Sequence, residues 1–268
     1  MHQEQVEYET LVCGGQVYFM KTLSTKQEVA SSVAELQDSY NKLYKGWMGQ
    51  HRNVGQAKQL LDLLDAQSGS LLDVACGLGY LLDMAEERGV VAYGLDIAQV
   101  ALNKSKSENV ARRLVLGNGE RLPWPDETFD HVVCLGSLEH FINPEFGARE
   151  IARVMKPSAK AAIMLPNSHH LQAIYNVYQT GGILPELQDF ERFATRVEWG
   201  AFLEKNGLRV LSVHKYNVGF ARVFKEGRGC FWYIFNILFR LFGDAWIPLN
   251  FSFALTFVCT KSDLTGSR

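Results

Sequence analysis

Hydrophobic residues in the middle of the chain fall into short unbroken runs separated by segments with helical spacing. The runs at 71–74, 90–95, 131–135 and 161–165 are almost wholly apolar, which is typical of strands buried on both faces of a sheet. Segments 81–88, 98–107 and 146–155 between them are predicted to be helices. A helix at 196–206 and strands at 208–216 and 251–260 complete the pattern. The whole predicts one α/β domain with insertions.

The N-terminal part has a different pattern. From 25 to 64 apolar residues recur at steps of three and four, as at Val33, Leu36 and Tyr40, which predicts helix. Residues 46–49, with a glycine at each end, break this segment into two helices. A shorter apolar stretch at 11–20, interrupted by two glycines, is either an edge hairpin or a loose arm.

The stretch from 71 to 82 reads LLDVACGLGYLL and predicts a strand, a tight turn and the start of a helix. Gly77 and Gly79 permit unusual backbone angles and let a ligand lie directly against the main chain. A dinucleotide-binding turn would need a third glycine where Leu82 stands. A turn that merely joins a strand to a helix is the structural alternative.

Three later segments carry polar residues at the ends of predicted strands. Asp96 follows the next strand roughly twenty residues after the turn, where a carboxylate suits both hydroxyls of a ribose, although it would also suit a helix N-cap. The second segment, 115–125, reads VLGNGERLPWP. The third, 129–141, reads FDHVVCLGSLEHF and ends in the candidate base His140.

The pattern Asp-x-Ala-Cys-Gly-x-Gly resembles motif I of class I S-adenosylmethionine (SAM) dependent methyltransferases, and the other three segments follow in that family's order. The Leu-Glu-His element is common in the subgroup resembling ubiquinone-pathway and sugar methyltransferases. The resemblance implies a Rossmann-like seven-stranded sheet, mostly parallel with an antiparallel last strand, and helices on both faces. Two departures stand out: Asn118 replaces the usual Asp and Trp124 the usual Phe.

The resemblance also implies the cofactor, SAM, with S-adenosyl-L-homocysteine as its product. The turn would hold the methionine part, Asp96 the ribose, and the 115–125 segment the adenine. The expected cofactor-binding residues are Asp73, Ala75, Cys76, Gly77, Gly79, Asp96, Ile97, Asn118, Gly119, Glu120, Leu135 and Gly136.

In this family N-terminal helices fold over SAM, so we divide the chain into an arm with covering helices at 1–64 and a SAM-binding core at 65–268. Insertions at about 166–194 and 218–250 are expected to form the acceptor side. The acceptor-side candidates are Tyr40, Tyr44, Trp47, His169, His170, Tyr175 and Tyr178.

Residues 230–242 read CFWYIFNILFRLF, which is apolar almost all round but too short and too interrupted for a convincing membrane span. Three interpretations remain open: a lid over an apolar acceptor pocket, a homodimer contact, or an element lying on a membrane surface. A small-molecule or lipid-linked acceptor is expected, with a peripheral membrane contact or a homodimer through 230–250.

Composition and charge narrow the possible functions and locations of the protein further. The net charge of −2 gives no electrostatic footprint for nucleic acid. The five cysteines are scattered without metal spacing, so no metal is expected. The polar, acidic first residues do not form a secretory signal, which favours a cytoplasmic protein, with membrane association left open.

Methyl transfer from SAM is a direct displacement, so the protein mainly aligns the nucleophile with the methyl carbon. A hydroxyl acceptor benefits from a general base. His140 is the first candidate because it follows the strand that faces the methyl group in this family, and His169 and His170 come second. The predicted activity is methylation of a small-molecule or lipid/sugar-type acceptor, first of all at oxygen. N-, C- or S-methylation and a non-catalytic SAM-binding interaction protein are the alternatives.

Overall fold

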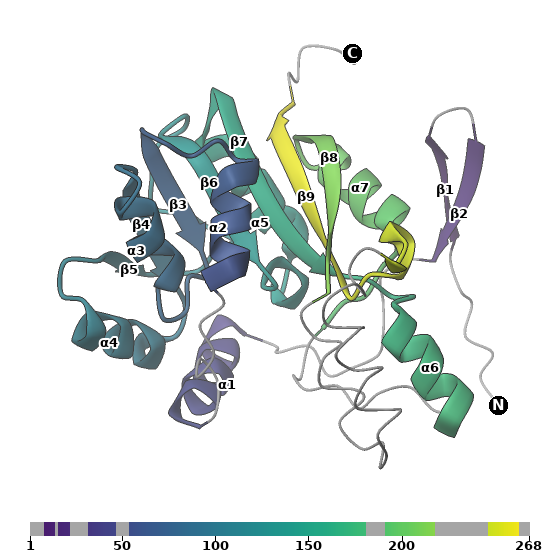
Figure 1. Cartoon of the computed structure of the whole chain (residues 1–268), viewed down its shortest axis with the longest axis horizontal. Coiled ribbons are helices and arrows are strands. Elements are labelled where there is room, and N and C mark those ends of the chain that lie inside the picture. The colour runs from purple at the N-terminus through teal and green to yellow at the C-terminus, as the bar shows by residue number, and fades with distance from the viewer. Residues whose placement is uncertain are drawn as a thin grey trace.

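A seven-stranded sheet forms the centre of the computed structural model, which describes residues 8–13, 16–21, 32–46, 54–180, 191–217 and 246–262. The strand order is β5-β4-β3-β6-β7-β9-β8 (Figure 1). The strands are β3 (Ser70–Val74), β4 (Val91–Asp96), β5 (Arg113–Leu116), β6 (Phe129–Leu135), β7 (Met155–Pro166), β8 (Leu208–Tyr216) and β9 (Ala254–Lys261). Only β9 runs antiparallel to its neighbours, β7 and β8. The predicted Rossmann-like sheet with an antiparallel last strand is confirmed.

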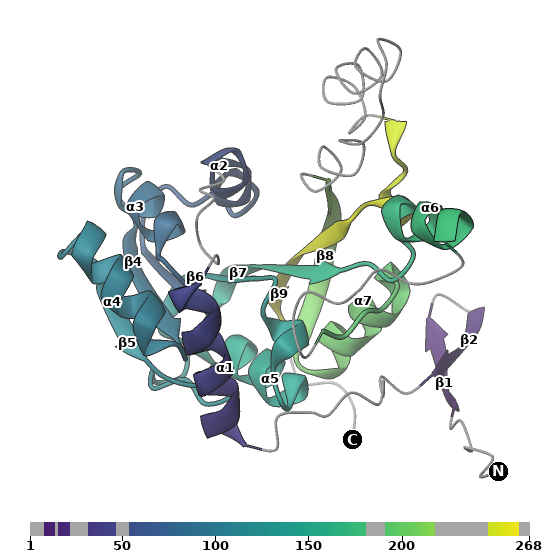
Figure 2. The same ribbon diagram turned by 90° about the horizontal axis from the view of Figure 1, so that it is seen from below.

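Helices cover both faces of this sheet. They are α2 (Val54–Leu63), α3 (Tyr80–Glu86), α4 (Gln99–Glu108), α5 (Pro144–Val154) and α7 (Arg196–Lys205). Figure 2 shows α2 and α3 on one side of the sheet and α5 and α7 on the other. Adjacent residues of β3 point to opposite layers: Leu71 packs with α2 and α3, whereas Leu72 packs in the core that contains α5 and α7. Burial on both faces explains why the predicted strands read as unbroken apolar runs.

Two strand boundaries differ from the prediction. Helix α5 ends at Val154 and the chain enters β7 directly, at Met155 rather than at Ala161. This early part pairs with β6, and the Lys156 ammonium lies 2.8 Å from a carboxylate oxygen of Asp130. The last strand starts at Ala254, because residues 249–251 form the short 3-10 turn η2 (Leu249–Phe251).

The N-terminal elements come next. Strands β1 (Tyr8–Cys13) and β2 (Gln16–Lys21) form an antiparallel hairpin, so of the two interpretations of this stretch the hairpin is correct. Helix α1 (Val33–Lys45) is capped by the Ser32 side chain, which accepts from the Glu35 amide. The helix lies beside α4 (Figure 2), which brings its apolar and aromatic residues to the carboxyl edge of the sheet.

The first predicted insertion contains α6 (Leu171–Thr180), and its end returns to the sheet edge through a bridge between Asn167 and Ala194. Most of the second insertion, including 230–242, lies outside the described residues, as does Trp47. None of the helices in the described ranges combines the length and apolar character needed to cross a bilayer.

Candidate cofactor and methyl-transfer site

The turn between β3 and α3 is held in an unusual backbone conformation. Ala75, Gly77 and Gly79 have φ angles of 61°, 54° and 70°, all in the left-handed region. Glycine adopts this region freely, whereas Ala75 does so at a steric cost. A Cβ at Gly77 would lie 2.5 Å from the hydroxyl oxygen of Tyr44, so α1 packs directly on the turn.

Asp96 ends β4 and ties this turn to the next helix. One carboxylate oxygen accepts from the Gly77 amide at 2.7 Å, and the other accepts from the Ala98 amide at 2.7 Å. The side chain is buried, and burial raises its pKa although the backbone amides oppose the shift. Asp96 is not the N-cap of α4, because that position is Ala98, whose side chain makes no capping hydrogen bond. The carboxylate instead fixes the chain just before α4 and lines the pocket described next.

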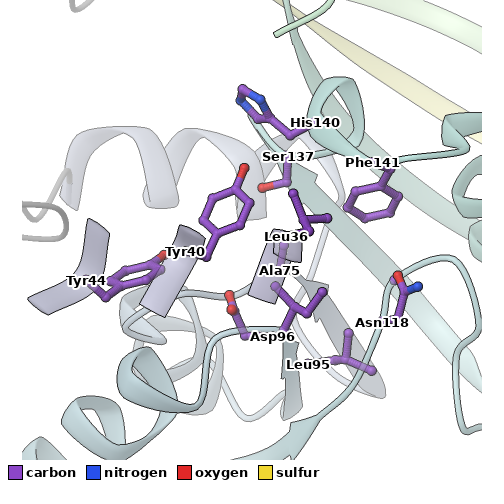
Figure 3. Close-up of a pocket in the computed structure, with 12 residues that line it drawn as sticks. Leu36, Tyr40, Tyr44, Ala75, Leu95, Asp96, Asn118, Ser137, His140 and Phe141 are labelled. Carbon is purple, nitrogen blue, oxygen red and sulfur yellow. The ribbon is translucent and has the colours of Figure 1, made fainter. Parts of the chain in front are cut away.

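A cavity opens at the carboxyl ends of β3, β4, β5 and β6, below α1 (Figure 3). Its lining is mixed, with carboxylate, amide, hydroxyl and imidazole groups among aromatic and aliphatic side chains. The lining residues are Leu36, Tyr40, Tyr44, Ala75, Leu95, Asp96, Ile97, Asn118, Gly119, Ser137, His140 and Phe141. Ligands of open α/β sheets bind at this edge.

Helix α1 is fastened over the cavity by polar contacts to the start of α4. The Gln37 side chain donates to the Ile97 carbonyl at 2.9 Å, and the Asn41 side chain accepts from the Val100 amide at 3.0 Å. Tyr44 is half-buried near Asp73 and Asp96, and burial raises the pKa of its hydroxyl. This helix therefore forms the roof of the pocket.

Asn118 and Gly119 line the cavity beyond β5, as expected. The Asn118 side-chain oxygen accepts from the Glu120 amide at 2.9 Å, which fixes the turn. Glu120 itself faces away: its carboxylate accepts from the backbone and side-chain nitrogens of Asn143 at 3.1 and 3.0 Å. Glu120 thus closes the loop that precedes α5 and is not part of the lining of this cavity.

The chain leaves β6 through Leu135 and Gly136. Gly136 has φ 58°, and its amide donates to the Met164 carbonyl at 3.0 Å. This left-handed turn leads into the 3-10 turn η1 (Leu138–His140). Neither Leu135 nor Gly136 lines the cavity, but the turn they form places Ser137 and His140 at its wall.

His140 is buried at the wall of the cavity, with its ring edge-on to Tyr40 at 6.4 Å between centroids. Burial, with a smaller contribution from the positive charge of Arg192, lowers the pKa of His140 to about 4. The imidazole is therefore neutral at pH 7. Glu139 is also buried, and burial raises the pKa of its carboxyl well above the usual range.

Three residues near the cavity are close enough together to hold a metal ion. One potential metal-ligand atom from each lies within 4.8 Å of the other two, in Glu139, His140 and Glu191. Spacing along the chain gave no sign of this cluster, because Glu191 comes from the acceptor-side insertion. The expectation of no metal rested on that spacing and stays a prediction.

The other residues of the turn sit behind the cavity wall. Asp73 is buried at the end of β3, and burial together with the nearby charge of Asp96 raises its pKa to about 8. Cys76 is half-buried with its sulfur towards Gly94, where a Cβ would lie 2.6 Å away. Burial also raises the pKa of the Cys76 thiol, so this cysteine has no thiolate character to offer a reaction.

The acceptor-side candidates divide into two groups. Tyr40 and Tyr44 line the cavity. His170 does not: its Nδ1 accepts from the Ala173 amide at the start of α6, and its ring packs edge-on to Phe253 at 5.0 Å. His169 also lies outside the lining, with its ring 2.7 Å from the Ser168 hydroxyl, and Tyr175 and Tyr178 are exposed on α6.

Several residues that build the site are not among the candidates predicted from the sequence. Leu36, Ser137 and Phe141 line the cavity. Arg112 supports the glycine-rich turn from behind: it is buried, donates to the Leu78 carbonyl at 2.8 Å and pairs with Asp83 at 2.5 Å. Ser137 and Phe141 flank the Leu-Glu-His element and so had a signal nearby, whereas Arg112 had none.

A glycine-rich turn, a buried carboxylate at the end of β4 and a polar loop after β6 lie together at the carboxyl edge of a seven-stranded sheet, which is the arrangement predicted for a class I methyltransferase. Residues 72–163 match the family model described as a methyltransferase domain. The chain is a class I SAM-dependent methyltransferase, similar to the ubiquinone-pathway O- and C-methyltransferases.

Known proteins that are similar to the chain agree with this class. A ubiquinone biosynthesis O-methyltransferase of Coxiella burnetii (strain RSA 331 / Henzerling II) is 24% identical over 196 residues, which cover 70% of this chain and 84% of that protein. A ubiquinone/menaquinone biosynthesis C-methyltransferase of Geobacter sulfurreducens is 26% identical, covering 61% and 74%. Among solved structures, a methyltransferase of Haloferax volcanii bound to the Trm112 activator superposes with a TM-score of 0.63 at 18% identity, covering 88% of this chain and 100% of that chain. This last likeness concerns the fold.

Proposed function

We propose that this enzyme transfers the methyl group of SAM to a hydroxyl oxygen of a small-molecule or lipid/sugar-type acceptor. The observation that carries the proposal is that Asp96, Asn118 and His140 line the same cavity. Asp96 and Asn118 suit the nucleoside half of SAM, and His140 stands where the acceptor would meet the methyl group.

The cofactor residues divide by the part of SAM that each would hold. Gly77 and Gly79 would hold the methionine part through their backbone. The space that a Cβ would take is already filled by protein side chains, by Tyr44 at Gly77 and by Ser105 at Gly79, so both positions require glycine. Asp96 keeps lone pairs for the ribose hydroxyls beyond the two amides that it already accepts. Ile97, Leu36 and Gly119 supply apolar walls for the adenine ring.

His140 is the proposed general base. Its imidazole is neutral at pH 7 and therefore has a lone pair that can accept a proton. A base with a pKa of about 4 accepts protons only weakly, so the best acceptor is a hydroxyl that is itself acidic, such as a phenol or an enol. Tyr40, edge-on to His140, would order both the base and the acceptor.

C-methylation is the second candidate, because one of the similar proteins carries that name and carbon acceptors such as activated rings lose their proton after transfer. N-methylation, in which a neutral amine attacks and its proton is lost afterwards, and S-methylation of a thiol after loss of its proton remain further alternatives. A non-catalytic SAM-binding interaction protein is the alternative of another class. We also propose a cytoplasmic or peripherally membrane-associated enzyme without a nucleic-acid partner.

The test has two parts. Calorimetry with SAM, S-adenosylhomocysteine and NAD separates cofactor classes, and tight NAD binding without SAM binding would overturn the proposal. The SAM-loaded enzyme is then offered a panel of phenols, enols, amines, thiols and prenylated aromatic compounds, and S-adenosylhomocysteine formation is followed by mass spectrometry. Product with the hydroxylated compounds alone supports O-methylation. Binding without any turnover supports the non-catalytic alternative.

A further inference from the structure

Arg192 makes a set of contacts that the proposed chemistry does not use. It lies at the end of the acceptor-side insertion, yet its guanidinium reaches the loop that follows β6. One nitrogen, Nη1, donates to the carbonyls of Glu139 at 2.9 Å and Phe141 at 2.6 Å, and Nη2 donates to the carbonyl of Ile142 at 3.1 Å. A single side chain thus ties together the backbone around His140.

These carbonyls need partners for a physical reason. They sit at the end of the 3-10 turn η1, where the last carbonyls of a helix have no partner within the helix. A planar guanidinium presents five N–H donors in a fixed fork and can satisfy several carbonyls at once, whereas a lysine ammonium is a compact point charge. The carboxylates of Glu145 and Glu120 also act on the Arg192 charge.

The other end of Arg192 is firmly held. Two residues later, Ala194 forms a bridge with Asn167 at the end of β7, and its carbonyl accepts from the Ser168 amide at 3.1 Å. Thr195 then caps α7 through a reciprocal pair of hydrogen bonds with Glu198. The backbone next to Arg192 is therefore fixed to the main sheet and to α7. The Arg192 side chain in turn restrains η1 relative to these elements.

The held loop is the wall of the cavity. Ser137, His140 and Phe141 all line it. The Phe141 ring leaves no room for a Cβ at Gly119 or Gly147, which would lie 2.4 Å from ring carbons. The packing of the Phe141 ring and the hydrogen bonds from Arg192 thus act on the same part of the loop, one on a side chain and the other on the backbone.

We propose that Arg192 is a positioning residue that fixes the His140 loop relative to the acceptor-side insertion. The guanidinium donates to three backbone carbonyls, which distinguishes it from an arginine kept for binding an anionic substrate. Through these contacts the insertion sets the distance between the acceptor and the methyl group. Within the described part of the chain, the hydrogen bonds of Arg192 go to the loop after β6 and not to the cofactor turn or Asp96, so we expect cofactor binding to be affected little.

The test compares Arg192→Gln, Arg192→Lys and Arg192→Ala with the matched control Arg196→Gln. Arg196 lies four residues away and donates to the Asn250 side chain at 2.9 Å, so its loss removes the same charge without touching the loop. Hydrogen exchange is followed at the amides of His140 and Phe141, which donate to Ser137 and Leu138 carbonyls. We expect exchange about tenfold faster or more in all three Arg192 variants and unchanged in the control.

Added guanidinium ion should slow exchange again in Arg192→Ala, and ammonium ion should not. S-adenosylhomocysteine affinity should change by less than about threefold, while kcat with an accepted substrate should fall by about tenfold or more. The kcat measurement rests on the proposed function, whereas the exchange and affinity measurements do not. A failure of the Arg192 proposal can therefore be told apart from a failure of the proposed function. Wild-type exchange in Arg192→Gln, or equal acceleration in Arg196→Gln, overturns the proposal. Where Arg192→Ala does not fold, Arg192→Gln decides.

Discussion

Replacing Asp96 by Asn tests two roles of this carboxylate, which are holding two backbone amides and binding the ribose of the cofactor. In the structure each oxygen accepts one backbone amide at 2.7 Å, from Gly77 and from Ala98. Asn keeps one oxygen and presents an NH₂ group to the other amide, so one donor faces another donor. The change is nearly isosteric, and it leaves the packing of the buried side chain in place.

The expected magnitudes follow from this geometry. One buried amide loses its acceptor, which costs about 1–3 kcal/mol of folding free energy. Burial already disfavours the charged form of Asp96, and removing the charge offsets part of that cost. In the cofactor complex one of two ribose hydroxyls loses a charged acceptor, worth about 1.5–3 kcal/mol. That corresponds to a drop of about 10- to 150-fold in affinity.

Calorimetry with S-adenosylhomocysteine measures the affinity, and thermal unfolding of the unliganded protein measures the stability. The matched control is Asp126→Asn, because Asp126 is an exposed carboxylate that pairs only across the surface with Arg153. The control should bind like the wild type. If folded Asp96→Asn binds within twofold of the wild type, the assignment of the ribose to Asp96 is wrong.

Three further experiments probe other groups of the site and the sheet. His140→Ala should lower turnover by about two orders of magnitude with S-adenosylhomocysteine binding intact; equal turnover, measured with and without EDTA, would rule out the base. Asp73, with a pKa of about 8, is mostly protonated at pH 7. The family resemblance assigns Asp73 to the cofactor-binding residues, and on that assignment the positive charge of bound SAM should expel the proton. Calorimetry in two buffers of different ionisation enthalpy should show this release in the wild type and its loss in Asp73→Asn; a wild type without release contradicts the assignment. Partial burial raises the pKa of Asp130, but hydrogen bonds from Lys156 and Ser70 bring it below the usual value. Its stabilisation is therefore full above about pH 4, near the unfolded pKa, and is lost as the pH falls further. Thermal unfolding from pH 7 to pH 2 should show Asp130→Asn destabilised at pH 7 and equal to the wild type at the acid end; a constant difference would refute the ion pair.

The sequence was most informative where a residue's role follows from its place in the chain. Leu71 and Leu72 face opposite layers, so a run of apolar residues was enough to identify a strand buried on both sides. Asp96 stood out because an acidic side chain directly follows such a run. The left-handed positions of Gly77 and Gly79 were foreseeable, since few other residues adopt that conformation.

The sequence was least informative where the partner is a distant backbone group. Arg192 donates to carbonyls some fifty positions earlier, such as that of Glu139. Every residue has a backbone carbonyl, so the sequence does not indicate which ones accept a hydrogen bond from a distant side chain. Arg112 is hidden partly for the same reason, because besides its ion pair with Asp83 it donates to the Leu78 carbonyl. His170 shows the opposite error. A histidine suggests a catalytic or binding role, whereas this one accepts from the Ala173 amide and packs on Phe253.

The position of β9 also bears on how the chain is made. It lies between β7 and β8 in the sheet but is synthesised after both. A nascent chain can therefore assemble β3 to β6 with the cofactor pocket while one side of β7 still has unpaired amides and carbonyls. An open strand edge of this kind is prone to pair with other chains. A premature stop before Ala254 should consequently yield an aggregating product rather than a smaller, inactive enzyme.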